Sequence, residues 1–72
     1  MAGLVKRSVL LSGHATSLAL EPEFWAVLDR MAGDEAVSLP ALLIGIDKER
    51  GRRSLASACR VRALAWLERA PA

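Results

Sequence analysis

The stretch HATSLALEPEFW, residues 14–25, holds a strand pattern that runs directly into a helix start. From Thr16 to Leu20, larger residues alternate with serine or alanine, and a period of two places alternate side chains on opposite faces of a β-strand. Pro22 then stands where a helix can begin, because the first helical position needs no N–H donor. The sequence therefore predicts a strand over about 15–20 and a helix over about 22–32.

This strand needs a hydrogen-bonding partner, and the sequence offers two. One is a second copy of the chain, because pairing across a two-fold axis is the commonest way in which small proteins form oligomers. The other is Val9–Leu11, which can fold back through Gly13-His14, a dipeptide suited to a tight hairpin turn. We expect the second copy, since no strand of matching quality follows in the chain. The two pairings are compatible, because paired hairpins form a four-stranded sheet.

Apolar residues at helical spacing follow the strand. Ser38 is a suitable N-cap for a second helix over about 38–50, and Ser54 for a third over about 54–69. Apolar residues at i, i+3, i+4 and i+7 predict one buried stripe on each of the first two helices: Phe24, Val27, Leu28 and Met31, then Leu39, Leu42, Leu43 and Ile46. Trp25 lies one residue off the first stripe and is either an interface anchor or a packing residue.

The third helix is apolar over much of its circumference. At about 100° per residue, its apolar residues fall into two groups: Leu55, Cys59, Ala63 and Trp66 on one side, and Val61, Leu64 and Ala65 mostly elsewhere. A helix of this kind is normally buried against more than one neighbour. One neighbour is expected within the chain, and a second subunit is a candidate for the other.

The composition also favours an oligomer. A domain of 72 residues buries only about 60% of its unfolded surface, yet 53% of these residues are hydrophobic. Cys59 is the only cysteine, which excludes a disulfide within the chain and is typical of a reducing, intracellular setting. No apolar run matches a signal peptide or the about 20 residues of a membrane span. We expect a cytoplasmic protein that does not enter a membrane.

The charges are segregated along the chain. Residues 21–47 hold six acids and one base, whereas residues 48–72 hold seven bases and two acids. Such asymmetry is typical of a protein with an anionic partner, and solvated helix faces explain it equally well. The densest basic run, Lys48, Arg50, Arg52 and Arg53, lies near the end of the second helix, where cations complement the helix dipole. We favour this structural interpretation for the run.

Three stretches of the chain, KRSVLLSGHATSLALEPEFWAVL, VSLPALLIGID and RRSLASACRVRALAWL, resemble a small bacterial subgroup of ribbon-helix-helix domain proteins. The resemblance covers roughly residues 6–67, and its most specific element is LEPEFW after an alternating strand. It implies a mainly α fold with a short β ribbon, β-α-α plus a third helix, in an intertwined homodimer with an antiparallel sheet between subunits. Residues 1–13 then form a basic N-terminal arm with room for a short strand, and residues 14–70 the domain.

The resemblance also implies which residues bind DNA, because the ribbon of this family places outward side chains in the major groove. Backbone amides at the start of the second helix would grip a phosphate. The resemblance implies DNA contacts from Ala15, Ser17, Ala19 and Ser38, and we expect Lys6, Arg7 and His14 to add much of the contact. The expected dimer core holds Thr16, Leu18, Leu20, Phe24, Leu42 and Ile46. Base readout favours long, forked donors, and the outward positions offer only Ala, Ser and Ala. DNA contact would therefore be largely electrostatic and sensitive to salt.

The residues give no basis for catalysis. One histidine, one cysteine and no tyrosine leave no nucleophile–base pair, and neither a metal-ligand spacing nor a glycine-rich phosphate loop is present. We expect no enzyme, no metal and no cofactor. The favoured function is a DNA-binding transcriptional regulator, acting as a homodimer or a higher oligomer. The alternative is a protein-interaction module, antitoxin-like or a structural dimer, with little sequence-specific DNA binding.

Overall fold

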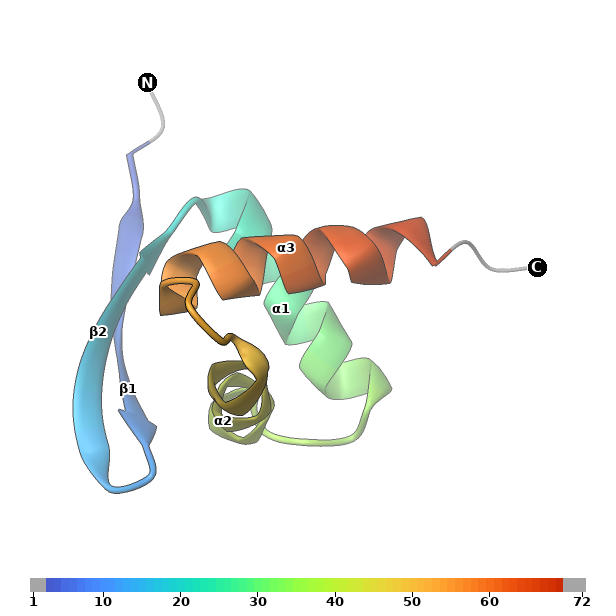
Figure 1. Ribbon diagram of the computed structural model, residues 1–72. Coiled ribbons are helices and arrows are strands. Elements are labelled where there is room, and N and C mark those ends of the chain that lie inside the picture. The colour runs from blue at the N-terminus through green and yellow to red at the C-terminus, as the bar shows by residue number, and fades with distance from the viewer. Residues whose placement is uncertain (1–2, 70–72) are drawn as a thin grey trace.

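The chain folds into a β-hairpin with three helices on one side of it (Figure 1). The computed structural model describes residues 3–69. The elements are β1 (Val5–Leu11), β2 (His14–Leu20), α1 (Pro22–Asp34), α2 (Leu39–Glu49) and α3 (Leu55–Glu68). A short β ribbon followed by helices, with an added third helix, is the predicted fold class, which is thereby confirmed. Residues 1–2 of the predicted arm and residue 70 of the predicted domain lie outside the described residues.

The partner of the predicted strand is in its own chain. β1 and β2 form a two-stranded antiparallel sheet whose register runs from Val5 opposite Leu20 to Leu11 opposite His14. The hairpin alternative is therefore confirmed, because the strand pairs with residues that precede it in the chain. The first strand is also longer than its apolar end, Val9–Leu11, suggests. The sheet between subunits of an intertwined homodimer stays a prediction.

The hairpin turn lies one residue earlier than the predicted Gly13-His14. Because Leu11 pairs with His14, the two-residue loop is Ser12-Gly13. Both residues have positive φ, 51° and 86°, as a hairpin turn of the I′ class requires at its two central positions. Gly13 adopts this conformation without the steric cost that a Cβ would bring.

One core joins the inner face of the hairpin to the helices. In β2, Leu18 and Leu20 are buried and Thr16 is half-buried, on the face that the alternation predicts to be inward. Among the described residues the core consists of Val9, Leu11, Leu18, Leu20, Trp25, Leu28, Met31, Ala32, Leu42, Leu43, Ile46, Ala58, Cys59 and Ala63. The chain thus encloses a core without a second subunit, so the composition alone does not require an oligomer. Thr16 and Phe24, predicted for a dimer core, are only partly buried here.

The buried stripe of α1 keeps Leu28 and Met31 of the prediction but includes Trp25 and Ala32 in place of Phe24 and Val27. Trp25 is 2% exposed and belongs to the stripe, whereas Phe24 and Val27 are only partly buried. The Trp25 indole Nε1 donates a hydrogen bond of 2.8 Å to the carbonyl oxygen of Val5. This bond ties α1 to the start of β1, so Trp25 anchors the hairpin within the chain.

Serine caps begin the other two helices, as predicted. The Ser38 Oγ accepts from the Ala41 N–H at 3.1 Å, and the Ser54 Oγ accepts from the Ser57 N–H at 3.1 Å. The inner side of α3 presents small residues, Ala58, Cys59 and Ala63, to the core. Burial raises the pKa of the Cys59 thiol to about 11, which keeps it protonated at neutral pH. Across residues 3–69, no helix has both the length and the apolar content needed to cross a membrane.

Candidate nucleic-acid interface

The strand register defines an outer face of the hairpin, turned away from the helices. Cross-strand neighbours share a face of a sheet, and three such pairs lie on this side. The outer hairpin face consists of Lys6 with Ala19, Ser8 with Ser17, and Leu10 with Ala15. All six side chains are exposed except Ala19, which is half-buried. The structure therefore brings Ala15, Ser17 and Ala19 together with Lys6 on one surface.

Arg7 lies on the opposite face from Lys6. Its guanidinium carbon is 4.4 Å from the centroid of the Trp25 ring, and its Nη1 is 3.6 Å from Oδ1 of Asp29. An arginine over an indole is held by a cation–π interaction, and the carboxylate adds a weak, exposed ion pair. Arg7 therefore covers the packed side of the hairpin, and the structure does not place it on the outer hairpin face.

His14 opens β2 directly after the turn. It pairs with Leu11 and so belongs to the inner set of residues, although at the end of the hairpin its side chain is exposed. The hollow beside it is also lined by Asp47 and Arg50 from the last turn of α2. His14 thus faces the carboxyl end of α2 and lies apart from the surface around Ser17.

Ser38 stands at the other end of α2. An 11-residue helix is about 16 Å long, and its carboxyl end is the one beside the hairpin turn. The amides near Ser38 are also largely used or missing: the serine caps the Ala41 N–H, and Pro40 has none. The structure therefore does not bring the predicted phosphate clamp together with the outer hairpin face.

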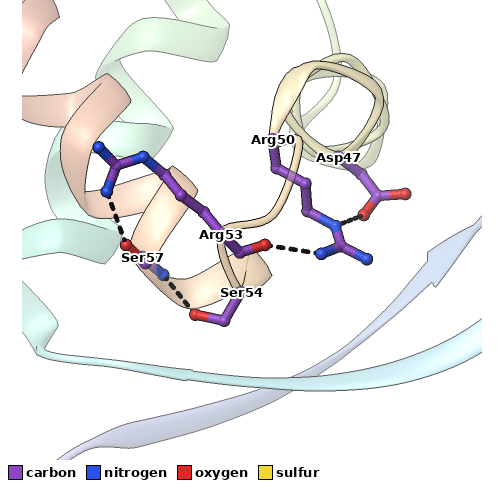
Figure 2. Close-up of polar contacts among 5 residues, drawn as sticks. All are labelled: Asp47, Arg50, Arg53, Ser54 and Ser57. Atoms are coloured by element: carbon purple, nitrogen blue, oxygen red, sulfur yellow. Dashed lines mark hydrogen bonds and ion pairs between the residues drawn. The ribbon is translucent and has the colours of Figure 1, made fainter.

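The basic run after α2 forms a hydrogen-bonded turn (Figure 2). Arg50 Nε donates to Asp47 Oδ1 at 2.7 Å, and its Nη1 donates to the carbonyl oxygen of Arg53 at 2.6 Å. Arg53 in turn donates from Nη1 to the Ser57 Oγ at 3.3 Å. Arg50 thus joins the end of α2 to the start of α3, in line with the structural interpretation of this run.

The hairpin and the three helices together match a known protein family. Residues 4–67 match the family model of the ribbon-helix-helix domain. The chain belongs to the ribbon-helix-helix family. Domains of this family are commonly DNA-binding regulators that usually form dimers, and they are typically non-enzymatic. No curated protein and no solved structure matches the chain.

Sequence reasoning missed two residues of the ribbon surface in this ribbon-helix-helix domain. Ser8 and Leu10 of β1 lie opposite Ser17 and Ala15, and Leu10 is 60% exposed. The signal was partial, because Val5, Val9 and Leu11 lie at alternate positions on the inward face but Arg7 interrupts them. Within the part of the chain that the structure describes, no cluster of three or more His, Cys, Asp or Glu side chains is placed to hold a metal ion.

Proposed function

We propose that this chain is a DNA-binding protein, a transcriptional regulator, whose outer hairpin face enters the major groove. A two-stranded ribbon has the width that this groove admits. The observation that carries the proposal is the surface itself: an exposed pair of strands with short side chains and one lysine, in a member of the ribbon-helix-helix family.

The side chains of this surface favour close approach over strong base readout. The facing hydroxyls of Ser8 and Ser17 can bond to any base edge, and the apolar Leu10 and Ala15 can contact thymine methyl groups. Lys6 supplies the positive charge, to guanine or to a phosphate. We therefore expect modest sequence preference and an affinity that falls steeply with salt.

A homodimer extends this surface. Each strand of the hairpin is paired along one edge only, which leaves two edges with unpaired backbone groups. Adding a second hairpin across a two-fold axis makes a four-stranded sheet and joins two outer hairpin faces. Two copies of Lys6 then lie on one continuous surface, which doubles its charge and suits a symmetric DNA site.

The experiment is a fluorescence anisotropy titration of randomised and genomic DNA fragments at several salt concentrations. Lys6→Ala should lower the salt slope by about 1 for each chain bound and weaken binding to all sequences alike. Lys48→Ala is the matched control, because Lys48 is exposed at the end of α2. Absence of binding at low salt would end the proposal. If Lys6→Ala and Lys48→Ala weakened DNA binding equally, the DNA would not contact the outer hairpin face specifically.

A second candidate is a protein-interaction module that uses the same surface. Leu10, 60% exposed on the outer hairpin face near the turn, favours it, because a large apolar residue contributes more to a protein interface than to phosphate contact. Purification from the native cell should then yield a stoichiometric protein partner that Leu10→Asp releases. Retention of that partner by the variant would place its binding surface elsewhere.

A further inference from the structure

The side of α3 that faces away from the core carries large apolar residues that are exposed. Val61 is 43% exposed and Leu64 is 53% exposed. They lie on one helical face together with Ser57, Ala65 and Glu68, because positions three and four apart fall on the same side. We call these five residues the α3 outer face. Figure 1 shows α3 along one side of the molecule, with α2 beneath it and α1 crossing behind.

The charges of α3 distinguish this face from its flanks. Two arginines of α3 and the one that follows it each pair with a carboxylate outside α3: Arg60 with Glu21 at 2.9 Å, Arg62 with Glu49 at 2.9 Å, and Arg69 with Asp34 at 3.0 Å. Among residues 3–69, no ion pair joins Glu68 or Arg53 to another side chain. Arg53 lies instead against the Ser57 hydroxyl, at 3.3 Å. A cation that forms no ion pair, Arg53, therefore lies beside the start of the α3 outer face, and an anion that forms none, Glu68, lies at its end.

The residue spacing on this face is symmetric. Ser57, Val61, Leu64 and Glu68 follow one another at steps of four, three and four residues, an order that is the same in both directions. These steps are those of the a and d positions along which helices pair in coiled coils. A two-fold axis between positions 62 and 63 therefore places Ser57 of one copy opposite Glu68 of the other, and Val61 opposite Leu64.

We propose that the α3 outer face binds the α3 outer face of a second copy of this chain, with the two helices antiparallel. Val61 of each copy then meets Leu64 of the other. Glu68 of each copy arrives at Ser57 of the other, where Arg53 lies. Two apolar contacts and two ion pairs form at once, and the ion pairs use Arg53 and Glu68, which form none within residues 3–69. Charge complementarity selects the antiparallel arrangement, because parallel helices would bring like charges together.

A hollow beside Val61 gives the second helix a place to dock. It has a volume of about 200 Å³ and lies between α2 and α3. Its lining includes the apolar Ile46, Ala58, Val61 and Ala65, and Arg53 is among its charged residues. A leucine side chain is small enough for such a hollow, so Leu64 of the second copy can insert there as a knob into a hole.

The contact is small, which sets its expected strength. A helix of 14 residues is about 21 Å long, and one helix pair buries less than the about 1,600 Å² of a standard interface. We therefore expect a reversible association that depends on concentration. It is independent of DNA binding, and it uses a different surface from the free strand edges of the hairpin. If hairpins pair as well, the α3 contact joins those dimers to one another.

Sedimentation equilibrium of the full chain over a range of concentrations tests the proposal. The mass should rise with concentration, and Leu64→Asp should abolish the step that is assigned to α3. Leu67→Asp is the matched control, because Leu67 is 47% exposed on the same helix but lies off this face. Circular dichroism checks that both variants are folded. A mass that Leu64→Asp leaves unchanged would overturn the proposal, as would equal losses in the two variants.

Charge reversal tests the antiparallel arrangement. Arg53→Glu and Glu68→Arg should each weaken the association at least tenfold, and the double variant should restore it, because the two ion pairs reform with exchanged signs. Failure of the double variant to recover would exclude the antiparallel pairing. A different protein that occupies this face while the purified chain does not self-associate would also overturn the proposal.

Discussion

The two faces of the hairpin are built from alternate residues of the same strands, yet they have opposite characters. The inner face buries its apolar residues against the helices, and its one cation, Arg7, lies over Trp25. The outer hairpin face carries small residues, one leucine and one lysine, nearly all exposed. Because a single step along a strand changes the face, neighbouring residues serve different ends. Inner positions hold the fold, and outer positions are free to meet a partner.

The largest expected effect is that of a charge on the inner face. Leu18 is 3% exposed, and Leu18→Asp buries an unpaired carboxylate. The penalty is several kcal/mol, which is comparable to the whole stability of such a domain, roughly 5 kcal/mol. We expect Leu18→Asp to be unfolded by circular dichroism. The neighbouring Ser17→Asp should remain folded, and an unfolded Ser17→Asp would remove the distinction between the faces.

The second effect concerns the hydrogen bond that ties α1 to β1. Trp25→Phe keeps an aromatic ring but leaves the Val5 carbonyl without the indole N–H, which should cost about 1–3 kcal/mol in urea unfolding. Trp66→Phe is the control: Trp66 also has an arginine near its ring, Arg69 at 4.7 Å, but its Nε1 has no acceptor among the described residues. A loss for Trp66→Phe as large as for Trp25→Phe would mean that the Val5 bond contributes little.

Adjacent cations allow a sharper comparison. Arg7→Ala should lower the free energy of unfolding by about 0.5–1 kcal/mol, since it removes a cation–π contact at a partly exposed site. Lys6→Ala should leave the unfolding free energy unchanged and lower the salt slope of DNA binding. Thermal unfolding and anisotropy titration of the same two variants separate these roles. A loss of stability in Lys6→Ala, with a lowered salt slope in Arg7→Ala, would contradict the roles assigned to the two faces.

The smallest effect lies at Glu21, between the end of β2 and the start of α1. The hydrogen bond from Arg60 holds the pKa of the Glu21 carboxyl below its ordinary value. A carboxyl with a lowered folded-state pKa stabilises the fold above its unfolded pKa, and this contribution is lost as the pH falls through the folded value. Glu21→Gln should therefore unfold at a slightly lower temperature than the natural chain at pH 7, with the difference vanishing in acid. A difference that grows on acidification would contradict this cause.

Much of the fold was predictable because its signals are local. The alternation before Pro22 and the serine caps at Ser38 and Ser54 depend on residues within a few positions of one another, and each element begins close to where they indicate. β1 was underestimated because Lys6 and Arg7 interrupt its apolar pattern. The inward position of Arg7 makes sense only beside Trp25, 18 positions later in the chain, and single-sequence periodicity does not report such a contact.

The candidate site was predictable to the same extent. The alternation places Ala15, Ser17 and Ala19 on one face without knowledge of the partner strand. The other half of that surface depends on the register of β1, so Ser8 and Leu10 were missed. Arg7 was predicted from its charge and Ser38 from the family resemblance, and both side chains are engaged elsewhere in this chain, over Trp25 and in a helix cap.

The single cysteine of this chain, Cys59, can report transient opening of the domain. Cys59 lies on the inner side of α3 and is fully buried. Its raised pKa keeps the nucleophilic thiolate scarce even when the pH is mildly alkaline. A disulfide reagent can therefore modify it only while α3 is lifted from the other helices, so the labelling rate measures how often that happens. Any ligand or assembly that clamps α3 in place should slow this chemistry, and no fluorescent tag or added reporter is needed to see it.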